Sequence, residues 1–283
     1  MAQPSTIDDV LRGARRRLRG APFAPSGREA NLLLAHALSL SEAQVIARQH
    51  DTLPEPDRER FESLLGRRLA GEPVAYVVGY KEFFGRPYAV DRRVLIPRPE
   101  TEHLVEAALQ LALPTAARIA DLGTGSGCIA CSLALELPAA RLIATDRSPG
   151  ALAVAHANRL RHRVRERVAL AVSDLATSLD LQALDLVVSN PPYIAGRDGA
   201  TLSPEIVDYE PHAALFAGED GSVFLRRLLT ELAGLRSGTW VLLEIGSDQP
   251  DLLARLSAGT PFDLVEIRRD YSGQHRIALL RHE

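Results

Sequence analysis

From Ala117 to the end of the chain, short apolar runs alternate with longer amphipathic segments, and this alternation restricts the possible folds. We predict strands at 118–122, 141–145, 168–172, 184–189, 240–245, 263–268 and 276–280. Segments with helical periodicity separate most of these runs, as in a largely parallel sheet covered by helices. The predicted fold class is therefore α/β, with seven strands that are mostly parallel.

Polar residues follow the first four of these strands. They are Asp121 with Gly123, then Asp146, Asp174 and Asn190. Open α/β sheets bind ligands beyond the carboxyl ends of their strands, so we expect these residues to face one site. The loop Gly123-Thr124-Gly125-Ser126-Gly127 lets a ligand approach the backbone. Asp146 suits ribose hydroxyls, and Asp174 suits an adenine amine.

The stretch Ser189-Asn190-Pro191-Pro192-Tyr193 ends the fourth strand abruptly. Two prolines lack N–H groups and stiffen the loop, so the carbonyls of Asn190 and Pro191 are spare acceptors. Together with the flat face of Tyr193, these acceptors suit a planar NH2 group, either a carboxamide or the exocyclic amine of a base. The alternative interpretation is a proline-rich turn with a capping asparagine.

A dinucleotide site is a competing interpretation of the glycine loop, because an acidic strand end also suits NAD. The glycines here follow the spacing Gly-x-Gly-x-Gly, whereas the dinucleotide motif is Gly-x-Gly-x-x-Gly. Asn190-Pro191-Pro192-Tyr193 also has no role in hydride transfer. The pattern therefore favours a different cofactor.

The N-terminal part of the chain has helical periodicity. We assign 1–72 to a helical domain, 73–97 to a β-hairpin linker with strands in 74–80 and 82–90, and 98–283 to the α/β domain. Five arginines crowd the first helix. They indicate either a solvated face or a surface for an anionic partner such as RNA.

Composition narrows the possible functions and partners further. The 283 residues carry a formal net charge of −3, which gives no general case for nucleic-acid binding. The two cysteines, Cys128 and Cys131, invite a redox or metal hypothesis, but no second pair completes a zinc site. We interpret them as structural and expect no metal. The absence of a long apolar span favours a cytoplasmic protein without a membrane partner.

The order of the glycine loop, Asp146 and Asn190-Pro191-Pro192-Tyr193 resembles the S-adenosylmethionine-dependent amino methyltransferases. Further stretches resemble the release factor glutamine methyltransferases, the PrmC or HemK family. These stretches are Ile96 to Glu102, Tyr209-Glu210-Pro211, Leu243 to Gly246 and Asp270-Tyr271. The resemblance covers essentially the whole chain and implies a class I, Rossmann-like methyltransferase domain.

The resemblance implies a role for each matching residue. The cofactor-binding residues would be Asp121, Gly123, Thr124, Gly125, Ser126, Gly127, Asp146, Asp174, Leu175 and Asn190. Leu175 departs from the family, in which this position is often aromatic. Substrate binding would fall to Asn190, Pro191, Pro192 and Tyr193, of which Asn190, Pro191 and Tyr193 would be catalytic.

The implied reaction is methyl transfer from S-adenosylmethionine, with S-adenosylhomocysteine as product. The acceptor would be the glutamine amide nitrogen in the Gly-Gly-Gln motif of class-one peptide chain release factors, which modulates translation termination. One alternative is an amine methyltransferase acting on DNA or ribosomal RNA bases. It is disfavoured because no separate domain with interleaved basic and aromatic residues is present. The other alternative, a non-catalytic scaffold, is disfavoured because the glycine loop, Asp146 and Asn190 are all intact.

Overall fold

The computed structural model describes residues 5–21, 23 and 25–283. Residues 1–4, 22 and 24, which belong to the predicted helical domain, lie outside this description. The chain forms two compact units, one of residues 1–80 with 202–209, and the other of residues 81–201 with 210–283. A segment of the second half of the chain therefore belongs to the N-terminal unit.

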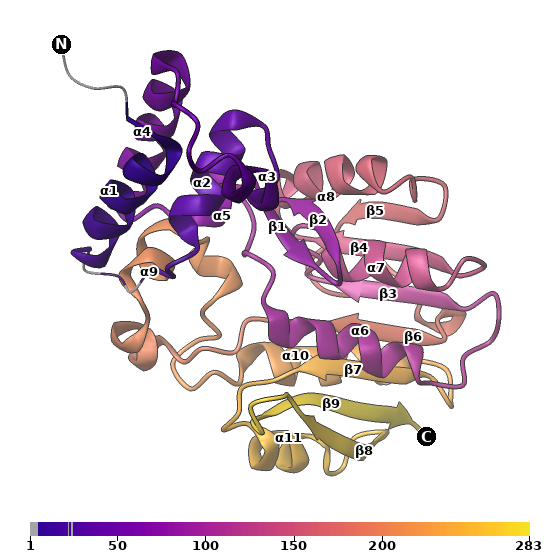
Figure 1. The fold of residues 1–283 in the computed structure, drawn as a ribbon. Helices are drawn as coiled ribbons and strands as arrows, with labels where there is room; N and C mark the ends of the chain where they lie inside the picture. Colours follow the sequence, from indigo (N-terminus) through magenta and orange to yellow (C-terminus); the bar gives the residue numbers. More distant parts are fainter. Residues whose placement is uncertain (1–4, 22, 24) are drawn as a thin grey trace. The chain divides into compact units, whose positions relative to one another are not determined.

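The first unit is helical (Figure 1). Its helices are α1 (Ile7–Arg19), α2 (Glu29–Leu38), α3 (Glu42–Ala47), α4 (Glu55–Leu69), α5 (Val74–Val78) and α9 (Pro204–Tyr209). Leu11, Ala14 and Leu18 of α1 are buried in the core of this unit, as their helical spacing predicts. The expected helical bundle is confirmed.

The strand that we predicted at 74–80 is wrong. Val74–Val78 is the short helix α5, which ends at Gly79 in a left-handed conformation. Four of its residues are buried, and a short apolar run of this kind does not distinguish a buried strand from a buried helix. The hairpin itself forms later, between β1 (Tyr80–Phe83) and β2 (Arg86–Ala89).

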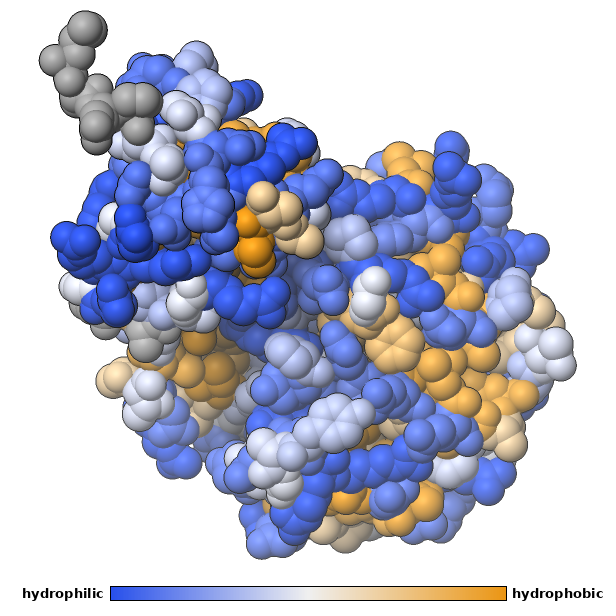
Figure 2. All heavy atoms as spheres, in the orientation of Figure 1, coloured by the Kyte–Doolittle hydropathy of each residue, from blue (hydrophilic) through white to orange (hydrophobic). Residues whose placement is uncertain are grey.

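Intramolecular partners hold several arginines of α1. Arg12 forms ion pairs with Asp8 and Asp9, and Arg17 forms one with Glu62. Most of the surface over this unit is hydrophilic in Figure 2. These pairs support the interpretation of α1 as a solvated face.

Arg68 is the most deeply buried cation of the helical unit, with a side chain only 2% exposed. Its guanidinium lies 2.6 Å from Glu29 and 2.9 Å from Glu205, and it stacks over the ring of Phe23 at 3.9 Å. The hydroxyl of Tyr209 also donates to the carbonyl of Ala70 at 2.9 Å. These contacts attach α9 to α2 and α4.

The second unit is built on a seven-stranded sheet of order β5-β4-β3-β6-β7-β9-β8 (Figure 1). The strands are β3 (Arg118–Leu122), β4 (Arg141–Asp146), β5 (Val168–Val172), β6 (Leu186–Ser189), β7 (Trp240–Glu244), β8 (Phe262–Arg269) and β9 (His275–His282). The first five are parallel, and β9 is antiparallel to both β7 and β8. The α/β class and the mostly parallel sheet are confirmed.

Alternate residues of each strand supply the two hydrophobic cores. On β3, Ile119 packs into the core that includes α6 (Glu102–Leu109) and α7 (Cys128–Glu136). Ala120 packs into the core that includes α10 (Val223–Glu231) and α11 (Pro250–Ser257). Helices therefore cover both faces, which places the polar residues of the strands at their ends. The remaining elements are α8 (Pro149–Arg161), η1 (Pro99–Thr101), η2 (Leu181–Ala183), η3 (Gly196–Thr201), η4 (His212–Ala214) and η5 (Leu232–Gly234).

Cys128 and Cys131 are both buried, free thiols on α7. Burial raises the pKa of Cys128 to about 12 and raises that of Cys131 as well. Their packing in the core supports the structural interpretation. Within the described part of the chain, every helix is too short or too polar to cross a membrane.

Candidate active site

A pocket lies beyond the carboxyl ends of β3, β4, β5 and β6. Of the predicted site residues, it is lined by Gly123, Gly125, Asp146, Asp174, Leu175, Asn190, Pro191 and Pro192. The sheet register brings these residues together, because Leu122 pairs with Thr145 on one side and Ser189 on the other. Asp121, Thr124, Ser126, Gly127 and Tyr193 are not among the lining residues.

The glycine loop follows β3 and is held tightly against β4. Gly125 has a φ of 54°, and its N–H donates to Asp146 Oδ2 at 2.9 Å. Gly127 has a φ of 78°, and a side-chain carbon there would lie 3.0 Å from the Cβ of Ala155 on α8. Both positions therefore require glycine, since a larger residue would be strained or would displace α8.

Asp121 lies beneath the loop and is completely buried. Its Oδ2 accepts hydrogen bonds from Thr124 Oγ1 at 2.5 Å and from the N–H of Ala130 at 3.2 Å. Its Oδ1 has no partner among the described residues. Burial raises the pKa of Asp121 to about 7, although these hydrogen bonds oppose the shift. An acceptor without a donor is costly in a folded protein and is typical of a functional position.

Asp146 ends β4 with both carboxylate oxygens engaged. Oδ2 accepts from Gly125, and Oδ1 accepts from the N–H of Ser148 at 2.8 Å. Each carboxylate oxygen accepts more than one hydrogen bond, so Asp146 retains acceptor capacity toward the pocket. The two backbone donors fix the orientation of the carboxylate.

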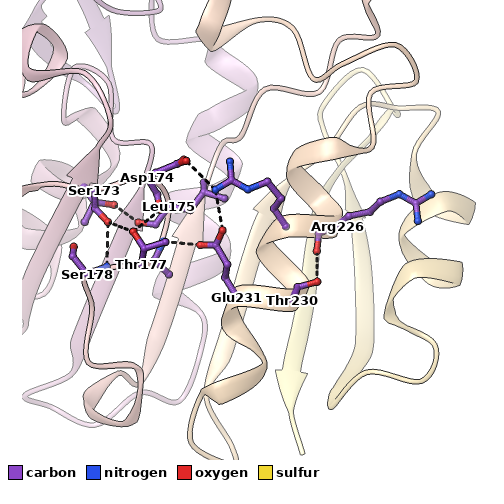
Figure 3. A network of polar contacts seen from close by, with 11 residues as sticks. Ser173, Asp174, Leu175, Thr177, Ser178, Arg226, Thr230 and Glu231 are labelled. Atoms are coloured by element: carbon purple, nitrogen blue, oxygen red, sulfur yellow. Dashed lines mark hydrogen bonds and ion pairs between the residues drawn. The ribbon is translucent and has the colours of Figure 1, made fainter.

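Asp174 and Leu175 follow β5, and Glu231 of α10 lies close to this stretch (Figure 3). Arg227 lies 3.0 Å from Asp174 Oδ2 and 2.9 Å from Glu231 Oε1. Leu175 has a φ of 53°, and its carbonyl accepts from Thr145 Oγ1 at 3.2 Å. The pocket wall here is completed by an aromatic side chain that we did not predict, Phe224 of α10.

Asn190 is hydrogen-bonded to Thr101, which is hydrogen-bonded in turn to Glu244. Its Nδ2 donates to Thr101 Oγ1 at 3.1 Å, and Thr101 Oγ1 donates to Glu244 Oε2 at 2.6 Å. Thr101 and Glu244 are 2% and 1% exposed. Burial raises the pKa of Glu244 to about 7, against the hydrogen bond from Thr101 and the charge of Arg276.

Tyr193 lies close to the same carboxylate. Burial raises its pKa to about 12, and the neighbouring charge of Glu244 adds to the shift. The phenol is therefore neutral at physiological pH. Gln249, the residue before α11, donates from Nε2 to the carbonyl of Gly221 at 2.9 Å and approaches the carbonyl of Tyr193 to 3.5 Å.

Glu210 anchors the far end of the long loop that begins at Pro191. Its Oε2 accepts from the N–H of Ile96 at 3.1 Å, and its Oε1 accepts from Arg98 at 2.6 Å. Ile96 and Arg98 thus meet Glu210, more than a hundred positions later in the sequence, within the second unit.

Sequence reasoning missed Thr101, Glu244 and Phe224 as site residues. Glu244 did carry a signal, because an acidic residue at the end of an otherwise apolar strand is rarely buried without a partner. Thr101 and Phe224 carry no comparable signal. A threonine after Pro99 and a phenylalanine in an amphipathic helix are ordinary in either setting.

Two protein-family models match the chain. The PrmC N-terminal domain matches residues 9–79, and the methyltransferase small domain matches residues 101–219. A release factor glutamine methyltransferase of Cereibacter sphaeroides is 43% identical over 274 residues, covering 96% of this chain and 97% of the relative. The chain belongs to the release factor glutamine methyltransferase family.

A second member of this family supports the assignment. The release factor glutamine methyltransferase of Nitratidesulfovibrio vulgaris is 41% identical over 281 residues, with 98% of this chain and 95% of the relative covered. Among solved structures, a ribosomal protein L11 methylase of Lactobacillus delbrueckii subsp. bulgaricus has a TM-score of 0.51 at 20% identity, covering 72% of this chain and 90% of that one. This similarity concerns the fold alone.

Proposed function

We infer that this chain transfers a methyl group from S-adenosylmethionine to the side-chain amide nitrogen of the glutamine in the Gly-Gly-Gln motif of class-one release factors. Membership of the release factor glutamine methyltransferase family supports the reaction. The observation that carries the assignment of residues is the position of Asn190, Pro191 and Pro192 in the wall of the pocket beside the glycine loop. The reaction would take place in the cytoplasm, where release factors act.

The residues of the pocket fit the three parts of S-adenosylmethionine. Gly123 to Gly127 would line the methionine end, where the unpartnered Asp121 Oδ1 beneath the loop suits a site for a cationic amino group. Asp146 would accept from the ribose hydroxyls, and Asp174 from the adenine amine. Leu175 and Phe224 would supply apolar contact to the base, so that Phe224 offers the aromatic ring that Leu175 lacks.

When bound, this cofactor supplies a methyl group activated by a sulfonium. The residues of the chain must then orient a poor nucleophile, because the lone pair of an amide nitrogen is delocalised into its carbonyl. Asn190 Oδ1 and the carbonyl of Pro191 would accept the two hydrogens of the substrate amide and direct its nitrogen into the pocket. Tyr193 would pack against the plane of that amide. Positioning of this kind accounts for a large part of many rate enhancements.

No side chain in this arrangement is assigned as a general base. The phenol of Tyr193 is protonated at physiological pH and is a poor proton acceptor. The proton of the methylated amide would pass to water or to a carbonyl. Acceptor groups at the amide hydrogens favour the positive charge that develops on nitrogen before this proton leaves.

We further propose that the helical domain, residues 1–72, recognises the release factor away from its glutamine. Residues 73–97 would form the linker and residues 98–283 the methyltransferase domain. The separate hydrophobic core of the helical unit supports an independent recognition role. Deleting this domain would then raise the KM for the release factor.

A methyl-transfer assay with labelled S-adenosylmethionine tests the function. The acceptors are a class-one release factor, its Gly-Gly-Gln→Gly-Gly-Ala variant, DNA and ribosomal RNA. We expect label on the intact factor alone. Label on nucleic acid alone would agree with the proposed cofactor and contradict the proposed substrate.

A further inference from the structure

Thr101 and Glu244 form a buried relay behind Asn190. Thr101 follows Pro99 at the start of α6, and Glu244 ends β7, so 143 residues separate the two side chains. Thr101 Oγ1 lies 2.6 Å from Glu244 Oε2 and 3.1 Å from Asn190 Nδ2. Neither Thr101 nor Glu244 lines the pocket, so each acts on a ligand only through another residue.

The hydrogen-bonding capacities of Glu244, Thr101 and Asn190 fix which group donates in each hydrogen bond. An ionised carboxylate only accepts hydrogen bonds, so the single hydroxyl hydrogen of Thr101 is directed toward Glu244. Thr101 Oγ1 can then only accept from Asn190, and the Asn190 side chain must turn its NH2 group toward Thr101. Its carbonyl oxygen is left for another partner.

We propose that Glu244 and Thr101 are positioning residues, which fix the Asn190 amide with Oδ1 available to accept from the substrate amide. This proposal rests on the proposed function, in which Asn190 Oδ1 grips a hydrogen of the glutamine NH2 group. A flipped Asn190 would present its own NH2 group to that NH2 group, and two donors would face each other. The relay therefore selects the productive orientation of a group that is otherwise nearly symmetric in shape.

The charged groups around Glu244 come from several elements. Arg276 of β9, Arg98 and Glu100 before α6, and Tyr193 after β6 all lie close enough to interact with it electrostatically. Arg276 is itself paired with Asp270 at 3.3 Å. The arginines favour the ionised carboxylate, whereas burial and Glu100 oppose it, and the resulting pKa of Glu244 is about 7.

Once Glu244 is protonated, the direction of the hydrogen bond between Glu244 and Thr101 is no longer fixed. A protonated carboxyl group can donate to Thr101, which frees the threonine hydrogen for the carbonyl of a flipped Asn190. The ionised form, present above the pKa, is the productive one. We expect the kcat at saturating S-adenosylmethionine and release factor to fall as the pH decreases through about 7.

The test compares Thr101→Val, Thr101→Ser and Glu244→Gln in the full chain with a release factor as acceptor. Thr101→Val keeps the shape and removes the hydroxyl, so we expect kcat to fall by about 10- to 100-fold, as for other residues that orient a functional group. Thr101→Ser retains the hydroxyl and should stay within about threefold of the wild type, near the lower end of the cost of losing one hydrogen bond. Glu244→Gln should lose the decline in kcat at low pH.

A matched control is Thr239→Val. Thr239 is also a buried threonine, and its hydroxyl donates to the carbonyl of Leu184 at 3.0 Å at the opposite end of β7. The Thr239→Val variant should have the kcat and the pH profile of the wild type. The affinity for S-adenosylhomocysteine, measured by calorimetry, should be unchanged in all four variants, which separates positioning of Asn190 from loss of the fold.

Different outcomes would contradict the proposed function and the proposed role of Thr101 and Glu244. If the wild type does not label the release factor, the proposed function is overturned and the relay loses its role. If the wild type is active and Thr101→Val matches it in kcat, only the relay is overturned. Should Thr101→Val not fold, the pH profile of Glu244→Gln decides, since an unchanged decline at low pH contradicts the proposal.

Discussion

Arg227 binds Asp174 and Glu231 at the same time, at 3.0 Å and 2.9 Å. The guanidinium thereby holds the carboxylate that follows β5 against α10. Its side chain is 36% exposed, so this ion pair contributes little to stability. Its effect lies in the orientation of Asp174 beside the pocket.

The Asp174 interaction leads to a binding prediction. Asp174→Ala removes the acceptor proposed for the adenine amine and should weaken S-adenosylhomocysteine binding by about 10-fold, the cost of one hydrogen bond to a charged group. Arg227→Met leaves that acceptor in place, so a change of no more than about threefold is expected from an exposed pair. Calorimetry measures both, with Arg236→Met, which breaks the exposed pair with Asp185, as the control. Equal losses in Asp174→Ala and Arg236→Met would contradict the assignment.

Asn190→Ala should abolish most of the activity. It removes an acceptor that acts on the reacting amide, and we expect kcat to fall by about 10²- to 10³-fold, as for other preorganised groups of this kind. Asn190→Asp keeps an acceptor but loses the donor to Thr101, so its side chain is no longer held and activity should also decrease. Single-turnover methylation of the release factor measures these effects. Near-normal turnover of Asn190→Ala would rule out the proposed site.

Phe224 is predicted to contact the adenine. Replacing Phe224 with Ala should weaken S-adenosylhomocysteine binding by about 5- to 10-fold, in line with the loss of roughly 1 kcal/mol of aromatic contact. Phe224→Tyr retains the ring and serves as the matched variant, with an affinity close to that of the wild type. An affinity unchanged in Phe224→Ala would mean that the base binds elsewhere along the pocket.

Arg68→Met should destabilise the helical unit. The substitution leaves Glu29 without its buried cation, and breaking a buried ion pair in this way costs about 3–5 kcal/mol. Glu205→Gln affects a partner that is 30% exposed and should cost much less. Urea unfolding followed by circular dichroism measures both. Equal stability of Arg68→Met and the wild type would show that Phe23 and the apolar stem of the side chain dominate at this position.

Asp121→Asn should change how stability depends on pH. The pKa of Asp121 is raised from 3.8 to about 7 in the folded protein, so the native state retains a proton that the unfolded state has already lost in this interval. Stability therefore falls as the pH rises from about 4 to 7, and the loss persists above that range. Asparagine cannot ionise, so this contribution disappears. Without ligand, the urea midpoint of Asp121→Asn should rise relative to that of the wild type between pH 4.5 and pH 8. A difference between the two midpoints that does not change with pH would contradict this.

The sheet and most of the pocket follow from local sequence. Each of the strands β3, β4, β5 and β6 is a largely apolar run followed or ended by a polar residue, and parallel pairing places Asp146, Asp174 and Asn190 at one edge of the sheet. The glycine loop is equally local, because Gly125 and Gly127 need backbone conformations that other residues avoid. These features were predictable since they depend on neighbours along the chain.

The supporting residues were not predictable in the same way. Asn190 meets Thr101 across 89 residues, and Thr101 meets Glu244 across 143. No periodicity connects side chains at such separations, and only the folded sheet brings them together. The prediction of a strand at 74–80 was wrong for another reason. Residues that are buried on all sides lack the alternation of apolar and polar positions that distinguishes a helix from a strand.

The helical unit is discontinuous in sequence, since it comprises residues 1–80 and 202–209. Arg68 and the carbonyl of Ala70 are the points at which α9 is attached. Exchanging the N-terminal domain between two members of the family therefore requires two grafts. A chimaera that receives foreign residues 1–80 but keeps its own 202–209 would pair an α9 with helices that did not evolve alongside it, and the mismatch would reach the loop that begins at Pro191, directly after Asn190.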